Sequence, residues 1–370
     1  MPLTLSDSSP ISLTRVETNE APFIARCADH TDGVVINLRF DTPPKHETLK
    51  RAALRARLQF LIDLESWRLP YLKGPEDKSF GSDAQTVLAK AASLPLDPTF
   101  FSDPGLADGF LRAAITAQVG ASLSFAPDFQ FRSLEDPWFG VNLQCIKRMR
   151  TLAPRMPIAA WVHVTLETML SGVLPFVAER YARELPIGTS LALTVSDMNL
   201  ERSPEEIATY LSAGEAFAAH GLRVLCDRSG EVAIAAACAG FASGVMIGNR
   251  IYRSAPPSPK YDSPYNPAIR LAYFDGARAR RVRRETARRR GENGKLGCRV
   301  SGDACKAIEA QDDENIELRL HAAHEMRESL RRAHALGARK LGSQWREADQ
   351  KHLRGLAQAL ELAEARSQEA

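Results

Sequence analysis

Polar and charged side chains follow short apolar runs at several points in the first 250 residues of this chain. These residues are Arg39, Asp41, Asp63, Glu65, Arg68, Asp128, His163, Ser196, Asp197, Asp227, Arg228, Asn249 and Arg250. The carboxyl ends of parallel strands converge on one face of a β/α barrel. Carboxylates far apart in sequence can therefore act there together as general acid, base or nucleophile. The pattern predicts one site at a barrel mouth.

Asp63 is the strongest of these candidates for catalysis. It ends the almost wholly apolar run Leu58 to Asp63 and is followed by Glu65, Trp67 and Arg68. A helix cap alone does not need such a density of charge and aromatic surface. We therefore expect Asp63 to be the acid or base, with Glu65 and Arg68 as substrate contacts.

Asp197 and Asp227 are the next candidates, because each follows an apolar run of strand length. They are expected to supply a nucleophile or a group that recognises a base. The alternative is that each caps a helix, since aspartate is a common N-cap. Arg39 and His163, at other strand ends, are expected to contact the substrate.

The segment GVMIGNR, Gly244 to Arg250, has the composition of an anion-binding strand end. Backbone N–H groups at Gly248 and Asn249 and the side chain of Arg250 would hold a phosphate near the last barrel strands. The alternative is that Gly248 only permits a tight turn.

Two cysteines and two histidines near the C-terminus form a candidate zinc site. His321 and His324 are three residues apart on a predicted helix and so share one face, and Cys298 and Cys305 precede them. Two thiolates and two imidazoles can form a tetrahedral structural zinc site. The alternative is exposed cysteines and surface histidines without a metal.

An arginine run between residues 278 and 290 is the strongest local charge feature. Eight arginines and one lysine stand against two glutamates in residues 277 to 295. The forked guanidinium group suits phosphate oxygens, so RNA or DNA is the expected partner. The alternative is an arm that packs on an acidic patch of a second copy, as in a homodimer.

The apolar runs that precede these side chains read as buried parallel strands, because they are continuous and do not alternate with polar residues. Seven are predicted: 34–39, 58–63, 121–126, 157–163, 190–196, 222–226 and 243–247. Ile11 to Val16 and Ile269 to Phe274 are both candidates for an eighth. Helical patterns separate the runs, which predicts a TIM-type (β/α)8 barrel with a helical C-terminal appendage.

Predicted helices between the strands cover 47–57, 143–152, 173–183, 204–220 and 231–239. Ser203 and Glu206 form a capping box before the fourth of these. An insertion at 73–118 holds two more helices, at 83–94 and 106–118, and is expected to form either a lid or an extra packing pair. Two long helices at 315–336 and 343–365 carry dense charge pairs.

The chain of 370 residues is 44% hydrophobic with a net charge of +3, enough for one large core plus an appendage. We expect the barrel at 1–253, a Pro-rich and then Arg-rich arm at 254–300, and the appendage at 301–370. The N-terminus shows no signal-peptide pattern and no apolar stretch is long enough for a membrane span. A cytoplasmic protein without membrane contact is predicted, with Cys145, Cys226 and Cys238 as reduced, buried thiols.

Together these features resemble the tRNA-guanine transglycosylase superfamily of barrels. Asp63 lies where that family has the aspartate of its strand-end motif, and residues 298 to 324 lie where it has a cysteine and histidine zinc site. The resemblance implies base exchange, a glycosyltransferase activity in tRNA modification. Asn249 stands where the family has its nucleophile, so this role would fall to Asp227 or Asp197.

The expected function is thus an enzyme that acts on a nucleotide or nucleic-acid base. Arg250 would bind a phosphate, and the arginine run would bind the nucleic-acid backbone. A catalytically inactive barrel that binds or recognises nucleic acid is one alternative. An enzyme acting on a small phosphorylated metabolite is another.

Overall fold

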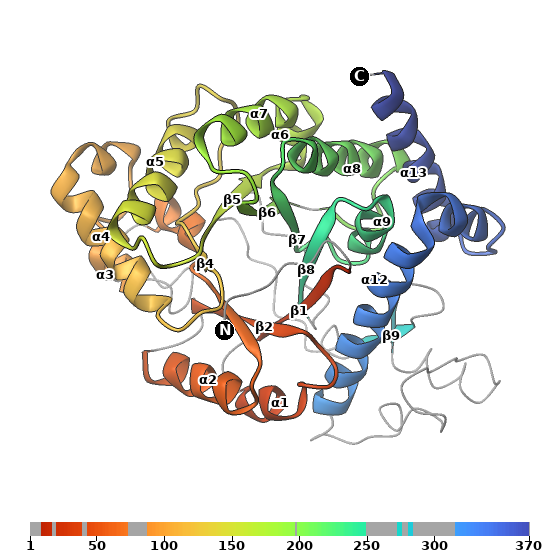
Figure 1. The fold of residues 1–370 in the computed structure, drawn as a ribbon, viewed down its shortest axis with the longest axis horizontal. Helices are drawn as coiled ribbons and strands as arrows, with labels where there is room; N and C mark the ends of the chain where they lie inside the picture. The colour runs from red at the N-terminus through yellow and green to blue at the C-terminus, as the bar shows by residue number, and fades with distance from the viewer. Residues whose placement is uncertain are drawn as a thin grey trace.

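The computed structural model describes residues 9–16, 20–38, 43–72, 87–196, 198–248, 272–275, 280–283 and 315–369. Eight parallel strands form one sheet in the order β3-β2-β1-β8-β7-β6-β5-β4. Their bounds are β1 Ile11–Val16, β2 Gly33–Asn37, β3 Gln59–Asp63, β4 Ser124–Phe125, β5 Ile158–Val164, β6 Ser190–Val195, β7 Arg223–Asp227 and β8 Ala242–Gly248. A parallel bridge between Leu61 and Leu123 brings the two ends of the sheet together. The chain therefore folds as the predicted TIM (β/α)8 barrel (Figure 1).

Helices surround this sheet on its outer side (Figure 1). Those described are α1 Ala21–Arg26, α2 Pro43–Arg55, α3 Val87–Ala91, α4 Pro104–Ala117, α5 Pro137–Leu152, α6 Leu166–Leu170, α7 Leu174–Glu184, α8 Pro204–Ala219, α9 Val232–Ala239, α12 Asn315–Arg346 and α13 Lys351–Glu369, with 3₁₀ turns at Ser66–Tyr71 and Pro98–Ser102. The predicted capping box at Ser203 and Glu206 begins α8. Of the insertion, α4 packs against α3 and α5, as the packing alternative requires.

The eighth strand is Ile11–Val16 and not Ile269–Phe274. β1 pairs with β2 and β8 at once, Leu13 lying opposite both Gly33 and Met246. The described part of the rejected run belongs to β9, Ala272–Asp275, which pairs antiparallel with β10, Arg280–Arg283. A barrel strand must run parallel to its neighbours, so β9 cannot close this sheet.

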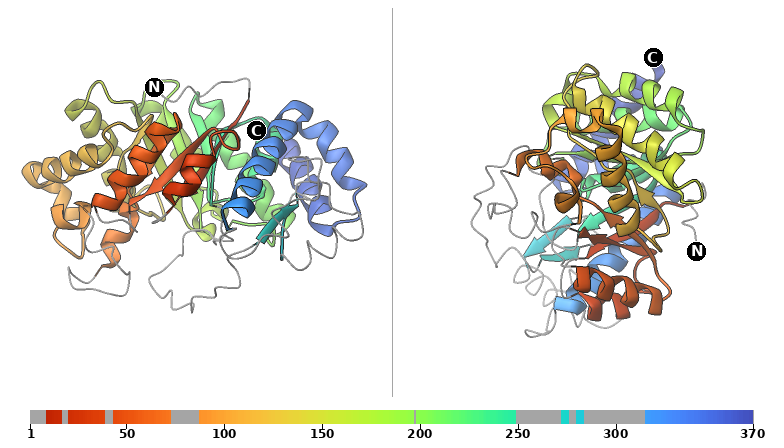
Figure 2. Two further views of the ribbon diagram at one scale, coloured as in Figure 1. Left: turned by 90° about the horizontal axis from the view of Figure 1, so that it is seen from below. Right: turned by 90° about the vertical axis from the view of Figure 1, so that its left-hand side faces the viewer.

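The C-terminal helices lie against the barrel. α12 packs on α9, β1 and α1, and α13 packs on α8 and α9. Figure 2 shows both helices, in blue, on the side away from α3 and α4. α12 is kinked at Gly337, whose φ of 68° and ψ of 169° are not helical. None of the helices in the described ranges is long and apolar enough to cross a membrane.

The inside of the barrel is apolar at its centre and polar at its mouth. A cluster of buried side chains fills the centre: Leu13, Val35, Leu61, Leu123, Phe125, Ala159, Trp161, Ala192, Leu225 and Met246. Side chains two residues apart on a strand face the same way. The next inward positions on six strands are Arg15, Asn37, Asp63, His163, Thr194 and Asp227, all buried or nearly so. These side chains form a polar layer above an apolar floor.

Gly214 lets α8 approach the ring of Phe241 closely, because a β-carbon there would overlap that ring. We expect Gly214→Ala to lower the free energy of unfolding by about 1–3 kcal/mol through overpacking. Gly109, inside α4, has open space around it. Gly109→Ala should instead raise stability by about 0.4–1 kcal/mol. Urea unfolding of both variants measures this, and equal effects would contradict the packing.

Cys27, Cys145, Cys226 and Cys238 are free thiols buried in the core. Burial raises the pKa of Cys27, Cys226 and Cys238 to about 12 and raises that of Cys145 as well. Because the thiolate is the reactive form, these four should resist iodoacetamide at pH 8 in the folded protein and react after denaturation. Peptide mapping by mass spectrometry checks this; modification of Cys145 before unfolding would contradict it.

Candidate active site at the barrel mouth

Arg15 lies at the centre of the polar layer and joins two aspartates from distant strands. Its Nη1 donates to Asp63 Oδ2 at 2.6 Å, and its Nη2 donates to Asp227 Oδ1, also at 2.6 Å. Its Nε donates to the same oxygen of Asp227 at 3.0 Å. Both carboxylates are almost fully buried. β1, β3 and β7 therefore meet at one guanidinium group.

Arg228, which directly follows β7, extends this cluster to Glu65. Its Nη2 donates to Asp63 Oδ2 at 2.9 Å and to Glu65 Oε1 at 2.6 Å. Asn37 on β2 donates to the same oxygen of Glu65 at 2.9 Å. We call Arg15, Asn37, Asp63, Glu65, Asp227 and Arg228 the ion cluster.

Two residues of the ion cluster have a strained backbone. Glu65 has a φ of 46° and Arg228 a φ of 51°. Both values lie in the left-handed region, which residues other than glycine rarely adopt. Arg57, after α2, is the other described non-glycine residue with positive φ. Such strain persists only where surrounding contacts enforce it and is common at functional sites. Here the ion pair between Glu65 and Arg228 joins the two strained positions.

The ion cluster also shifts protonation. Burial raises the pKa of Asp63, and the guanidinium groups of Arg15 and Arg228 lower it only in part. Burial alone would lower the pKa of Arg228, but the surrounding carboxylates raise it on balance. Arg228 therefore stays charged, while Asp63 takes up a proton more readily than an exposed aspartate.

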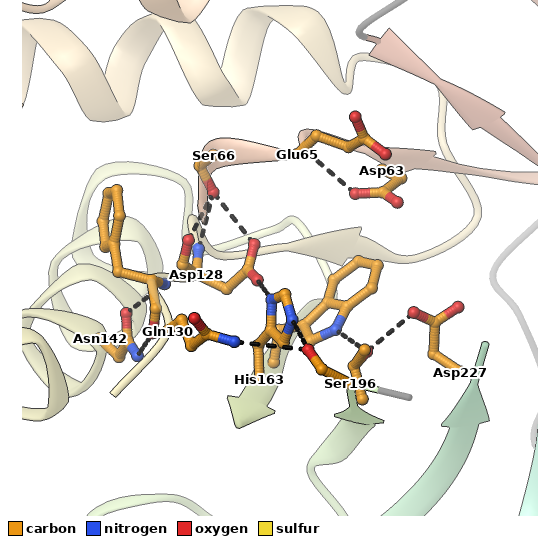
Figure 3. A network of polar contacts seen from close by, with 12 residues as sticks. Asp63, Glu65, Ser66, Asp128, Gln130, Asn142, His163, Ser196 and Asp227 are labelled. Atoms are coloured by element: carbon orange, nitrogen blue, oxygen red, sulfur yellow. Dashed lines mark hydrogen bonds and ion pairs between the residues drawn. The ribbon is translucent and has the colours of Figure 1, made fainter. Parts of the chain in front are cut away.

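Beside the ion cluster, His163 lies between a carboxylate and a hydroxyl (Figure 3). Its Nδ1 is 3.6 Å from Asp128 Oδ2, and its Nε2 is 3.4 Å from Ser196 Oγ. The three side chains come from the segments after β4 and β6 and from β5, and their residues are only 1–3% exposed. The ring of Trp67 packs edge-on against that of His163, with 5.0 Å between the ring centroids. We call Asp128, His163 and Ser196 the relay.

The loop that carries Asp128 is fixed on both sides. Oδ1 of Asn142 on α5 accepts a hydrogen bond from the backbone N–H of Phe129, and Nδ2 donates one to the carbonyl of Phe129, both at 2.8 Å. Ser66 accepts the backbone N–H of Asp128 at 2.8 Å, and its hydroxyl lies 3.0 Å from Oδ1. The carboxylate is thus held in place before any ligand arrives.

The two aspartates of the ion cluster differ from Asp128 of the relay in how fully their carboxylate oxygens are hydrogen-bonded. Asp63 accepts two guanidinium N–H groups on Oδ2 and the backbone N–H of Glu65 on Oδ1. Asp227 accepts Arg15 on Oδ1 and the Thr194 hydroxyl on Oδ2. Asp128 Oδ2, by contrast, accepts no hydrogen bond from the described residues, and His163 Nδ1 lies 3.6 Å from it. Spare capacity for proton transfer therefore lies in the relay.

The structure brings Asp63, Glu65, Arg68, His163 and Asp227 together at the mouth, as the strand-end pattern predicts. Their predicted catalytic and binding roles stay predictions. The predicted residues that lie outside the described ranges are Arg39, Asp41, Asp197, Asn249, Arg250, Cys298, Cys305 and most of the arginine run, whereas Gly248 ends β8.

His321 and His324 lie on α12, outside the barrel. The ring of His324 meets that of His30 at 5.6 Å. Within the described ranges no three histidine, cysteine or acidic residues gather as metal ligands. The two predicted cysteine ligands are outside these ranges, so structural zinc stays a prediction.

Sequence reasoning missed Arg15, which pairs with both Asp63 and Asp227. One signal was available, because a lone arginine interrupts the otherwise uncharged strand ISLTRV. Asn37 and Thr194 were missed as well, since a single amide or hydroxyl in an apolar run carries little signal.

No family model matches the chain, and no curated protein matches it. Similar solved structures include a xylanase of Paenibacillus barcinonensis, with 12% identity, 68% of this chain and 88% of that chain covered, and a TM-score of 0.40. A GH10 xylanase of Thermobacillus composti has 8% identity and a TM-score of 0.40, and the match covers 66% of this chain and 86% of that chain. A nitroalkane oxidase of Streptomyces ansochromogenes has 15% identity, covers 98% and 99%, and has a TM-score of 0.32.

The resemblance to tRNA-guanine transglycosylases is wrong. The similar solved structures include several xylanases, and no family model matches the chain. The predicted glycosyltransfer on a nucleotide or nucleic-acid base, with its role in tRNA modification, is therefore wrong as well. In the structure, moreover, Asp227 has both oxygens occupied by Arg15 and Thr194, unlike a free nucleophile. These comparisons do not show a family for this chain.

Removal of Arg15 tests the ion cluster. Arg15→Met should lower the free energy of unfolding by about 3–5 kcal/mol, because it leaves buried carboxylates unpaired. Arg183→Met, which removes an exposed pair with Glu179, is the control and should cost less than about 1 kcal/mol.

The Arg15→Met deficit should depend on pH. Loss of Arg15 raises the already raised pKa of Asp63 further. A carboxyl with a raised folded-state pKa favours folding below its unfolded-state pKa, and this contribution is lost as pH rises through the folded value. The deficit should therefore be larger near pH 8 than near pH 5 in urea titrations. A deficit that grows toward acid would contradict the assignment.

Proposed function

We propose that this protein is a hydrolase whose active site is the barrel mouth, with His163 as the group that transfers the proton. The observation that carries this is the position of His163 between Asp128 Oδ2 and Ser196 Oγ, at 3.6 and 3.4 Å. A carboxylate behind an imidazole orients it and stabilises its protonated form. The imidazole can then accept a proton from a hydroxyl or water and return it to a leaving group.

The position of the relay in the barrel supports this proposal. It lies at the carboxyl ends of β4, β5 and β6, the face on which barrel enzymes carry their active sites. The ion cluster next to it pairs the charges of Arg15 and Arg228 with those of three carboxylates. A rigid, internally paired wall of this kind holds the relay in a site of low dielectric, where electrostatic interactions are stronger than in water.

A second candidate keeps the predicted role of Asp63, with Asp63 as the acid. The raised pKa of Asp63 favours it, since a buried carboxyl that retains its proton can donate it. The two candidates differ in one measurement. If Asp63 is the acid, Asp63→Asn should reduce turnover as strongly as His163→Gln does.

The cytoplasmic location and the binding of nucleic acid by the arginine run stay predictions.

His163→Gln tests the proposed function. Turnover of nitrophenyl acetate, nitrophenyl phosphate and nitrophenyl glycosides should be measured for the wild type, and the substrate that is cleaved is then used for the variants. We expect His163→Gln to lower turnover by about 10²–10⁴-fold, because general acid–base catalysis contributes that much. His220→Gln, at an exposed position after α8, should leave turnover unchanged. Equal turnover in wild type and a folded His163→Gln protein would refute the proposal.

A further inference from the structure

We propose that Ser196 is a covalent nucleophile and that the substrates are carboxylic esters. This inference rests on the proposed function of His163 and specifies its substrate class. It starts from the arrangement in Figure 3, in which Asp128, His163 and Ser196 follow one another in a chain of polar contacts. Such a constellation is recognised by geometry and roles and occurs on unrelated folds.

The hydrogen-bond partners orient the relay in one direction. Asp128 Oδ2 accepts no hydrogen bond from the described residues, and the imidazole Nδ1 of His163 lies 3.6 Å from it. A proton on His163 Nδ1 satisfies this carboxylate and leaves Nε2 as an acceptor. The hydroxyl of Ser196, 3.4 Å away, is then the donor to Nε2. This is the protonation pattern that activates a serine.

Gln130 gives Ser196 a second neighbour with a different role. Its Nε2 donates to Ser196 Oγ at 3.4 Å, and its Oε1 accepts from Tyr71 at 3.4 Å, which fixes the direction of the amide. A glutamine side-chain N–H is one of the groups that can stabilise an oxyanion, and here it contacts the serine oxygen itself. Gln130 and Asp128 flank Phe129, which Asn142 holds on both its backbone groups. The same clamp therefore positions Gln130, which contacts Ser196, and Asp128, which faces His163.

Other buried hydroxyl groups on the barrel strands lack this arrangement. Thr194, also on β6, accepts from Trp161 Nε1 and donates to Asp227 Oδ2, both at 2.8 Å. Its proton is thus committed to a carboxylate of the ion cluster. Ser124 on β4 is fully buried, and its hydroxyl has no hydrogen-bond partner among the described residues. Ser196 differs from both because its hydroxyl lies beside an imidazole nitrogen, His163 Nε2.

The reaction follows from these positions. Ser196 Oγ forms a bond to the ester carbonyl carbon while its proton passes to His163 Nε2. The bond from this carbon to the alkoxy oxygen then breaks, and the alcohol leaves with the proton from Nε2. Water repeats the sequence on the acyl-serine: its proton passes to Nε2, its oxygen bonds to the carbonyl carbon, and Ser196 Oγ leaves and recovers the proton. The products are one alcohol and one carboxylic acid.

The test is covalent labelling of the full chain with phenylmethanesulfonyl fluoride, a small reagent suited to a buried serine. Its sulfur bonds to Oγ, fluoride leaves, and the hydroxyl proton passes to His163. We expect one adduct per chain, mapped to the peptide that contains Ser196 by mass spectrometry. This result needs no variant. No adduct, or an adduct confined to another residue, would overturn the inference.

Matched variants separate this inference from the proposed function. Ser196→Ala should abolish labelling and lower nitrophenyl acetate turnover by about 10³-fold or more. His163→Gln should slow labelling at least about 100-fold, and Ser124→Ala should change neither. Circular dichroism confirms that each variant is folded. Turnover that persists in Ser196→Ala but is lost in His163→Gln overturns the covalent role alone, whereas turnover that persists in both overturns the proposed function as well.

Discussion

The pairing of one buried guanidinium, that of Arg15, with Asp63 and Asp227 is the interaction on which the barrel mouth depends. An ionised side chain that loses its partner in a protein interior costs several kcal/mol. The three residues lie on β1, β3 and β7, and the two aspartates are 48 and 212 residues from Arg15 in the chain. They pair only if β1 lies between β2 and β8 in the observed register. Closure of the sheet and neutralisation of its charges therefore require each other.

This constraint divides the mouth into two parts with different properties. In the ion cluster, the carboxylates of Asp63 and Asp227 accept hydrogen bonds on every oxygen, so these side chains are held in place and can change partner only at high cost. In the relay, the contacts at His163 are longer, 3.4 and 3.6 Å. Catalytic hydrogen bonds are often long in a protein without substrate and tighten in the reacting complex. A rigid wall beside a looser proton path is what an acid–base site needs.

Elements outside the sheet hold this arrangement from behind. Asn142 of α5 fixes the backbone on either side of Phe129, and Ser66 at the start of a 3₁₀ turn fixes Asp128. On the opposite side of the barrel, α12 covers β1 beside α9, and Arg319 pairs with the buried Glu20 at 2.5 Å. The C-terminal helices thus help to pack the strand that carries Arg15.

The sequence alone determined the barrel and several of the residues at its mouth. Continuous apolar runs separated by helical patterns are a property of local sequence, because strands buried on both faces need apolar side chains at every position. Polar residues after such runs, including Asp63, His163 and Asp227, could be located in the same way. Only the tertiary structure decided their partners: Arg15, whose strand was one of two candidates, binds both aspartates, and Asp128 and Ser196 enclose His163. The family resemblance failed for the same reason, because it compared the order of residue types along the chain. Which lone pairs are occupied depends on contacts of about 3 Å between segments far apart in sequence, and packing sets those distances.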